Sequence, residues 1–299
     1  MTRLVDFHMF ALKDLNLPAL PAWWDELEAD PAVQQYANFG IAGAYGLIAF
    51  IAAIQLVRIQ LRVPEYGWTT QKVFHLLNCC VSCMRAGVFL FRPSLENLHP
   101  VLAKVFLLDL PGLLFFTTYT LLVLFWAEIY HQARSMPTGS LRPVFTAINV
   151  VVYAVLGGLW TLSCLTVDGA VQQLAYILSD VTLAAVSVAA AIGFLLYGGR
   201  LFLMLQRFPI ESRGRRKKLQ EVGLVTSICA GCFSLRAVFV ALSALDRTEL
   251  ELDVIGHPIL NVLYYALVEV LPSVCVLFIL RKLPPKRAAQ QGYQQIPSS

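Results

Sequence analysis

Seven long apolar runs alternate with short polar segments along the chain. They cover residues 37–61, 73–91, 105–130, 144–167, 173–197, 220–245 and 257–280. A helix needs about 20 apolar residues, each rising about 1.5 Å, to cross the hydrocarbon core of a bilayer. The pattern therefore predicts an all-α membrane protein built as a bundle of seven transmembrane helices.

Prolines mark the expected ends of these helices, because a proline ends a helix at little cost there. Two of them, Pro111 and Pro272, instead lie inside apolar runs. We expect them to kink their helices, or to leave backbone groups that neighbouring residues must satisfy. The fifth run continues as "YGGRLFLMLQRF" (197–208), which predicts a helix that extends beyond the bilayer.

Basic residues predict the orientation of the bundle. In the short loops and helix ends, fifteen Lys and Arg residues fall on the side of the C-terminus and five on the opposite side. Because basic residues accumulate in cytosolic loops, the N-terminus is predicted to be lumenal and the C-terminus cytosolic. The expected organisation is a lumenal segment 1–36, a transmembrane domain 37–281 and a cytosolic tail 282–299. No cleaved signal peptide is expected at the N-terminus.

Composition supports this class. Hydrophobic residues make up 58% of the 299 residues and charged residues only 14%, whereas soluble domains carry about 25% charged residues. All seven cysteines fall in apolar runs, so we expect no disulfide framework. Cys229 and Cys232 have the spacing of a metal or redox pair, but in a membrane helix we expect them to serve packing.

Five ionisable residues lie in the outer half of the predicted bundle, where charge is costly. They are Arg85, Asp109, Asp180, Arg236 and Glu269. The first interpretation is an intramembrane charge network that fixes helix packing. The second is a lumen-facing pocket for a polar or anionic ligand. In the third, the arginines extend to the membrane surface without a partner.

Glu128, His131 and His75 could provide zinc ligands near the inner ends of their helices. The other three histidines map to the opposite side, so we favour interface histidines and a contact between Glu128 and Arg134. No nucleophile–base spacing or phosphate-binding loop occurs. The sequence therefore predicts no metal site, no cofactor and no enzymatic activity.

A basic segment between the fifth and sixth runs, "RFPIESRGRRKKLQEVG" (207–223), is predicted to face the cytosol. It can act as a topology signal attracted to anionic lipid, or as a docking site for a cytosolic protein or RNA. Its six cationic residues are Arg207, Arg213, Arg215, Arg216, Lys217 and Lys218.

The polar tail contains Gly292, Tyr293 and, three residues later, Ile296. This pattern resembles tyrosine-based sorting signals for lysosomal or vacuolar membranes, and it predicts a sorting-like element.

Several motifs resemble the tobamovirus multiplication protein family of plants. They are "WWDE" (23–26), "LPGLLFFTTYTLLVLFWAEIYHQAR" (110–134), the basic segment 207–223 and "YYALVEVLPS" (264–273), within a likeness that covers residues 22–288. The resemblance implies a seven-helix protein of the vacuolar membrane (tonoplast), used by tobamoviruses as a host factor for RNA replication. It also implies binding to helicase-containing viral replication proteins and a link to an Arf-like small GTPase.

Two functional hypotheses follow. The first is a non-enzymatic membrane scaffold whose cytosolic loops recruit partners, with self-association as a homo-oligomer as a further option. The alternative is a G-protein-coupled-receptor-like signalling protein with a pocket around Arg85, Arg236 and Glu269, although the expected receptor motifs are missing. A transporter or membrane hydrolase is disfavoured, because no broken-helix or metal signature is found.

Overall fold

The computed structural model of the chain describes residues 22–62, 69–96, 101–207, 213–246 and 257–281. Within these ranges the chain forms helices and turns, and seven helices are long and apolar enough to cross a membrane. The elements are α2 (Ala22–Ala29), α3 (Pro31–Arg62), α4 (Thr70–Leu90), α5 (Arg92–Glu96), α6 (Val101–Ala133), α7 (Leu141–Leu165), α8 (Gly169–Gly193), η1 (Phe194–Gly198), α9 (Gly199–Arg207), α10 (Arg213–Asp246), α11 (Pro258–Tyr265), η2 (Ala266–Val270) and α12 (Leu271–Leu280).

The predicted seven-helix architecture is confirmed. α8, η1 and α9 form the fifth span, and α11, η2 and α12 form the seventh. The first helix begins at Pro31, six residues before its apolar run, and the fifth continues to Arg207, as its sequence predicted. The helices extend past their apolar runs because polar residues can continue a helix once it has left the hydrocarbon core.

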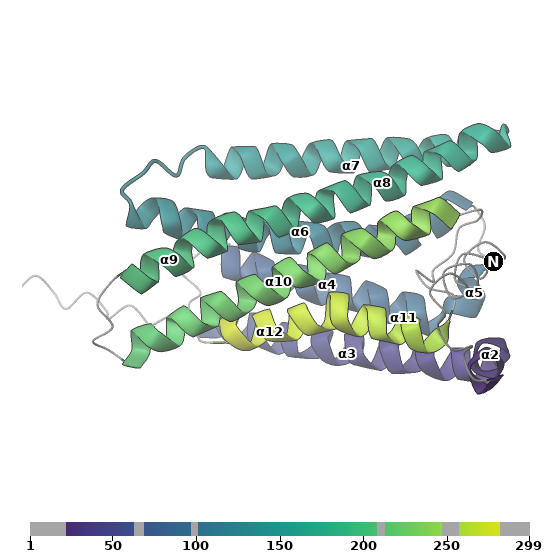
Figure 1. Cartoon of the computed structure of the whole chain (residues 1–299), viewed down its shortest axis with the longest axis horizontal. Coiled ribbons are helices and arrows are strands. Elements are labelled where there is room, and N and C mark those ends of the chain that lie inside the picture. The colour runs from purple at the N-terminus through teal and green to yellow at the C-terminus, as the bar shows by residue number, and fades with distance from the viewer. Residues whose placement is uncertain (1–21, 63–68, 97–100, 208–212, 247–256, 282–299) are drawn as a thin grey trace, which may run out of the picture.

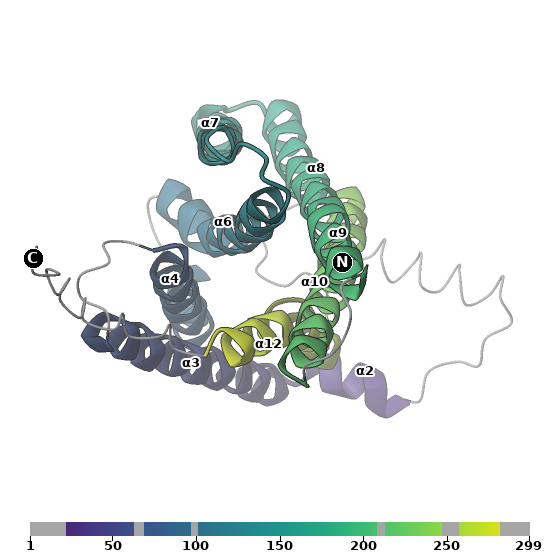
Figure 2. The ribbon, with the colours of Figure 1, turned by 90° about the vertical axis from the view of Figure 1, so that its left-hand side faces the viewer.

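The helices run roughly lengthwise through the molecule (Figure 1). α3 packs along α4, α6 lies against α4 and α7, and α8 connects α7 to α10. Seen along the bundle, α7 lies at the edge, next to α6 and α8 (Figure 2). We call the two ends of the bundle the α2 end and the α9–α10 end, after the helices found there in Figure 1.

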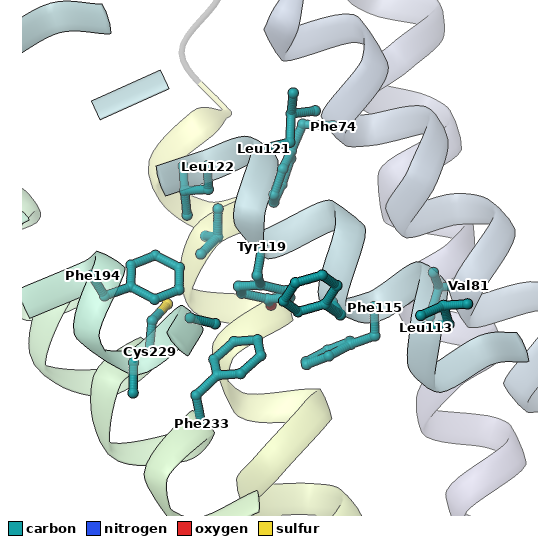
Figure 3. Packing of buried hydrophobic residues seen from close by; sticks show 14 of the residues in the cluster. Phe74, Val81, Leu113, Phe115, Tyr119, Leu121, Leu122, Phe194, Cys229 and Phe233 are labelled. Carbon is teal, nitrogen blue, oxygen red and sulfur yellow. The ribbon is translucent and has the colours of Figure 1, made fainter. Parts of the chain in front are cut away.

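Aromatic side chains fill the centre of the bundle around α6 (Figure 3). Tyr119 is fully buried, and its ring centroid lies 4.5 Å from that of Phe115 and 5.3 Å from that of Phe233. Phe194 packs on Phe233 at 5.8 Å, and the Tyr119 hydroxyl shares a 3.1 Å hydrogen bond with Ser273. This cluster joins α6 to η1, α10 and α12, so α6 is the central helix of the fold.

His257 attaches α2 to the start of α11 at the α2 end. Its ring stacks on Trp24 with centroids 3.9 Å apart. Nδ1 accepts a hydrogen bond from the Ile259 backbone N–H at 3.3 Å, which caps α11. The other nitrogen, Nε2, lies 3.2 Å from the Trp24 carbonyl oxygen. With Nδ1 as the acceptor, neutral His257 carries its proton on Nε2 and donates it to Trp24.

The seventh span contains a π-helical turn, η2, just before Pro272. Leu271 donates its backbone N–H to the Ala266 carbonyl, five residues back. The next bond of this π pattern would run from residue 272 to the Leu267 carbonyl, but proline has no N–H. The Cys232 thiol donates to that carbonyl instead, at 3.1 Å. The compensation expected at Pro272 is therefore supplied by a cysteine on α10.

This geometry predicts that Cys232→Ala destabilises the protein by about 1–3 kcal/mol, because a carbonyl inside the apolar span loses its donor. Cys232→Ser keeps a donor and should retain most of the stability in thermal unfolding in detergent. Cys229 is the matched control, since it is also buried but its thiol makes no hydrogen bond with any of the described residues. At Cys229, Ser should offer no advantage over Ala. Equal stability of the two Cys232 variants would contradict the compensating role.

Candidate functional site

The carboxylate of Glu269 is the centre of a buried charge cluster. Arg85 donates to it through two atoms, Nε to Oε2 at 3.0 Å and Nη2 to Oε1 at 2.7 Å. Arg236 donates from Nη1 to Oε1 at 2.7 Å, and Tyr45 donates its hydroxyl to Oε2 at 2.6 Å. A carboxylate has about four acceptor positions, so Glu269 is saturated by these four bonds. We call these four residues the Glu269 hub.

The hub connects distant parts of the sequence. Tyr45 comes from α3, Arg85 from α4 and Arg236 from α10, while Glu269 lies in η2. All four are buried, and Glu269 is 0% exposed. The two-atom contact of Arg85 also fixes the relative orientation of α4 and η2, because both donors of the planar guanidinium must meet both carboxylate oxygens. Four of the seven spans are thus held at one point.

Glycine and aromatic residues complete the surroundings of the two arginines. A side chain on Gly112 would place its Cβ 2.8 Å from Nη2 of Arg236 and 3.6 Å from Nη2 of Arg85, so α6 approaches the guanidinium groups only because this residue is glycine. The guanidinium of Arg85 lies 5.2 Å from the ring centroid of Tyr265, and that of Arg236 lies 5.6 Å from the ring of Phe115. The face of an aromatic ring attracts a cation. The rings therefore stabilise the positive charge that remains when the single carboxylate of Glu269 is shared by two arginines.

Three of the five charged residues predicted to form a network therefore meet at one carboxylate. Asp109 is partly buried on α6 and Asp180 is buried on α8, and each has interaction partners. Sequence reasoning missed Tyr45. Its only signal is a hydroxyl in the otherwise apolar, glycine-rich stretch "GIAGAYG" (40–46).

The cationic residues of the predicted docking segment fall on two helix ends. Arg207 is the last residue of α9, and the other five lie in the first two turns of α10, which begins at Arg213. The structure thus places this group at the α9–α10 end of the bundle (Figure 1). The sorting-like residues Tyr293 and Ile296 lie outside the described residues.

The residues considered as zinc ligands do not come together as a metal site. Among the described residues, no group of three or more His, Cys, Asp and Glu side chains could hold a metal ion. His131 Nδ1 lies 2.8 Å from the Ala127 carbonyl oxygen, while His75 is fully buried. The contact expected between Glu128 and Arg134 is replaced by a 2.7 Å ion pair between Glu128 and Arg142 of α7. Arg134 instead lies over the ring of Tyr130. All seven cysteines are free thiols.

Comparison with known proteins identifies the family. The model of the THH1/TOM1/TOM3 domain matches residues 19–296. The chain belongs to the THH1/TOM1/TOM3 family. It is 55% identical over 273 residues to Tobamovirus multiplication protein 1 of Arabidopsis thaliana, which covers 91% of this chain and 92% of the relative. It is 56% identical over 270 residues to Tobamovirus multiplication protein 3 of Nicotiana tabacum, with 90% of each chain covered. No solved structure matches.

The family assignment agrees with the resemblance found in the sequence. The names of these relatives refer to virus multiplication and not to a reaction. In this member of the family, the Glu269 hub joins four helices through charges that the lipid cannot solvate.

We predict that Glu269→Gln destabilises the protein strongly, by about 3–5 kcal/mol, because two buried arginines lose their counter-charge. The measurement is thermal or denaturant unfolding of the purified protein in detergent. Arg142→Gln is the matched control, since it breaks an ion pair of the same length whose arginine side chain is 72% exposed. The control should change stability by about 1 kcal/mol or less.

A triple variant with methionine in place of Arg85, Arg236 and Glu269 should recover much of the stability lost in Glu269→Gln, because it removes the unpaired charges. If Glu269→Gln is as stable as the unchanged protein, the hub does not hold the helices together.

Proposed function

We propose that this protein is a non-enzymatic multi-pass membrane host factor that supports tobamovirus multiplication. The observation that carries the proposal is the match to proteins named Tobamovirus multiplication protein 1 and 3, at about 55% identity over nine tenths of the chain. Its role is to tether helicase-containing viral replication proteins to the vacuolar membrane (tonoplast), as a scaffold for the viral replication complex.

The docking surface of the proposed scaffold is the cationic group at the ends of α9 and α10. The twelve residues 207–218 carry six positive charges against one negative charge, Glu211, and this excess creates a strong local positive potential. With the N-terminus lumenal and the C-terminus cytosolic, this group faces the cytosol, where soluble replication proteins are made. The same orientation agrees with the excess of basic residues at this end.

Further partners belong to the same proposal. An Arf-like small GTPase binds the cytosolic side, and anionic lipid lies near the basic residues of the helix ends. The protein acts as a single chain or as a homo-oligomer. The tail residues Tyr293 and Ile296 direct it to the vacuolar membrane.

The receptor-like alternative receives no support from the comparisons. Its pocket would rest on Arg85, Arg236 and Glu269, but the four acceptor positions of Glu269 are occupied by donors from the chain itself. A ligand that used this carboxylate would have to displace Tyr45 or an arginine. The scaffold hypothesis needs no such opening of the core.

The proposal predicts that replacing the five cationic residues of 213–218 by glutamine abolishes recruitment of tobamoviral replication protein to membranes that carry the variant. Long-range attraction and the contacts made by these charges are lost together, while the Glu269 hub is untouched. Recruitment is measured by flotation of membranes with added replication protein, at low and at moderate salt.

The control removes positive charge from a different helix at the same end of the bundle. It uses Arg58 and Arg62, which are exposed on α3. Their replacement by glutamine should leave recruitment intact. A C-terminal tag probed with protease checks that each variant keeps its orientation, since basic loops also determine topology. Full recruitment by a correctly oriented five-charge variant refutes the docking role.

A further inference from the structure

The fifth and sixth spans are much longer than a bilayer requires. The fifth covers 38 residues, Gly169–Gln206, or about 57 Å, and α10 covers 34 residues, or about 51 Å. The hydrocarbon core is about 30 Å thick, and even a tilt of about 40° leaves the fifth span about 44 Å tall. Figure 1 shows α9 and the start of α10 reaching beyond the end of α12. These two helix ends form an extension of the bundle.

The two helices of the extension interlock through a pair of glycines. A Cβ on Gly223 of α10 would lie 2.9 Å from the Phe202 ring of α9, so the ring rests directly on the α10 backbone. One turn away, the glycine is on the other helix: Gly198, the last residue of η1 before α9, faces Thr226 of α10. A Cβ on Gly198 would lie 2.9 Å from Cγ2 of Thr226 and 2.6 Å from the ring of Trp126 on α6. We call these contacts, Phe202 on Gly223 and Thr226 on Gly198, the glycine seam.

The seam lies immediately below the cationic group. Arg207 is five residues beyond Phe202 on α9, and Lys218 is five residues before Gly223 on α10. Five helical residues correspond to about 7.5 Å on each helix. The seam therefore determines how far apart, and at what angle, the two charged helix ends stand.

We propose that the glycine seam holds the ends of α9 and α10 as one rigid cationic surface, and that this surface binds an acidic surface of a soluble protein. The inference rests on the proposed docking function and adds the residues that position it. Preorganisation of this kind raises affinity because less conformational entropy is lost on binding. A flexible basic loop would attract the same partner but would not select its shape.

The position of the charges favours a protein over the bilayer as the occupant. Arg207 lies seven residues, about 10 Å, beyond the exposed Arg200 on α9. Arg213 lies eight residues, about 12 Å, beyond Glu221 on α10. Arg200 is the first charged residue after the apolar stretch of the fifth span, and Glu221 is the last charged residue before the apolar stretch of α10. The headgroup layer is only about 5–8 Å thick on each side, so the helix ends that carry the outermost cationic residues reach beyond it.

Gly223→Leu tests the seam, because it displaces the Phe202 ring without changing any charge. Gly199→Leu is the matched control: it is also a glycine of the extension, but nothing lies within 4 Å of the position of its Cβ. Full-length variants in phosphatidylcholine nanodiscs are assayed for binding of tobamoviral replication protein. Gly223→Leu should lose as much binding as the five-charge variant, and Gly199→Leu should bind like the unchanged protein.

Two further measurements make the result decisive. Phe202→Ala removes the ring without a clash, so it should also weaken binding even if Gly223→Leu folds poorly. Spin labels at Leu205 and Gln220 should give a narrow distance distribution that broadens in Gly223→Leu and Phe202→Ala but not in Gly199→Leu.

The outcomes separate this inference from the proposed function. If the five-charge variant loses binding while both seam variants bind normally, the charges dock the partner but the seam does not position it, and the inference is overturned. If the five-charge variant binds normally, the proposed docking function fails together with the inference. Binding that appears only after phosphatidylserine is added to the nanodiscs, and persists in the seam variants, identifies lipid as the occupant and also overturns it.

Discussion

The carboxylate of Glu269, buried among apolar helices and shared by two guanidinium groups, is the constraint on which the rest of this fold depends. An unpaired ion at such a depth costs at least a few kcal/mol even on the mildest scale, and here three ions are buried together around one point. They are tolerated only if Arg85, Arg236 and Glu269 meet at hydrogen-bonding distance. Since these residues come from α4, α10 and η2, any arrangement of the helices that separates them is strongly disfavoured. Apolar packing alone gives no comparable selection, because lipid tails solvate apolar faces about as well as other helices do.

This requirement explains several local irregularities that look unfavourable by themselves. Gly112 weakens a helix, but it lets α6 approach the arginines, and the π turn η2 carries Glu269 within the seventh span. In a membrane every backbone polar group must find a partner inside the protein. Pro272 violates that rule at the Leu267 carbonyl, and Cys232 restores it. On α10, Cys232 and Arg236 are four residues apart and therefore share a face, so the same surface of that helix satisfies both the charge and the carbonyl.

How much of this could be predicted from the sequence depends on the kind of information needed. Seven spans follow from apolar runs alone, and the cost of burying charge singles out Arg85, Arg236 and Glu269. The partners of a polar group depend on helix rotation and depth, which the pattern does not encode. Glu128 illustrates this: the nearby Arg134 looked like its partner, yet the 2.7 Å ion pair is with Arg142 of the next helix. Tyr45 escaped notice for the same reason, and in the sequence only Pro272 marks the neighbourhood of the π turn η2.

The hub and the glycine seam are mechanically related because both act on α10. Gly223 and Arg236 are thirteen residues apart, which places them on faces of the helix about 140° apart and about 20 Å apart along its axis. One face is fixed against η2 by charge, and the other is fixed against α9 by close contact of a ring with backbone. A helix held on two faces can neither rotate nor slide without breaking one set of contacts. The orientation of the charged end of α10 therefore depends on the Glu269 hub, which is buried deep in the bundle. The buried Arg85 and Arg236 thus help to determine the direction in which the cationic start of α10 points.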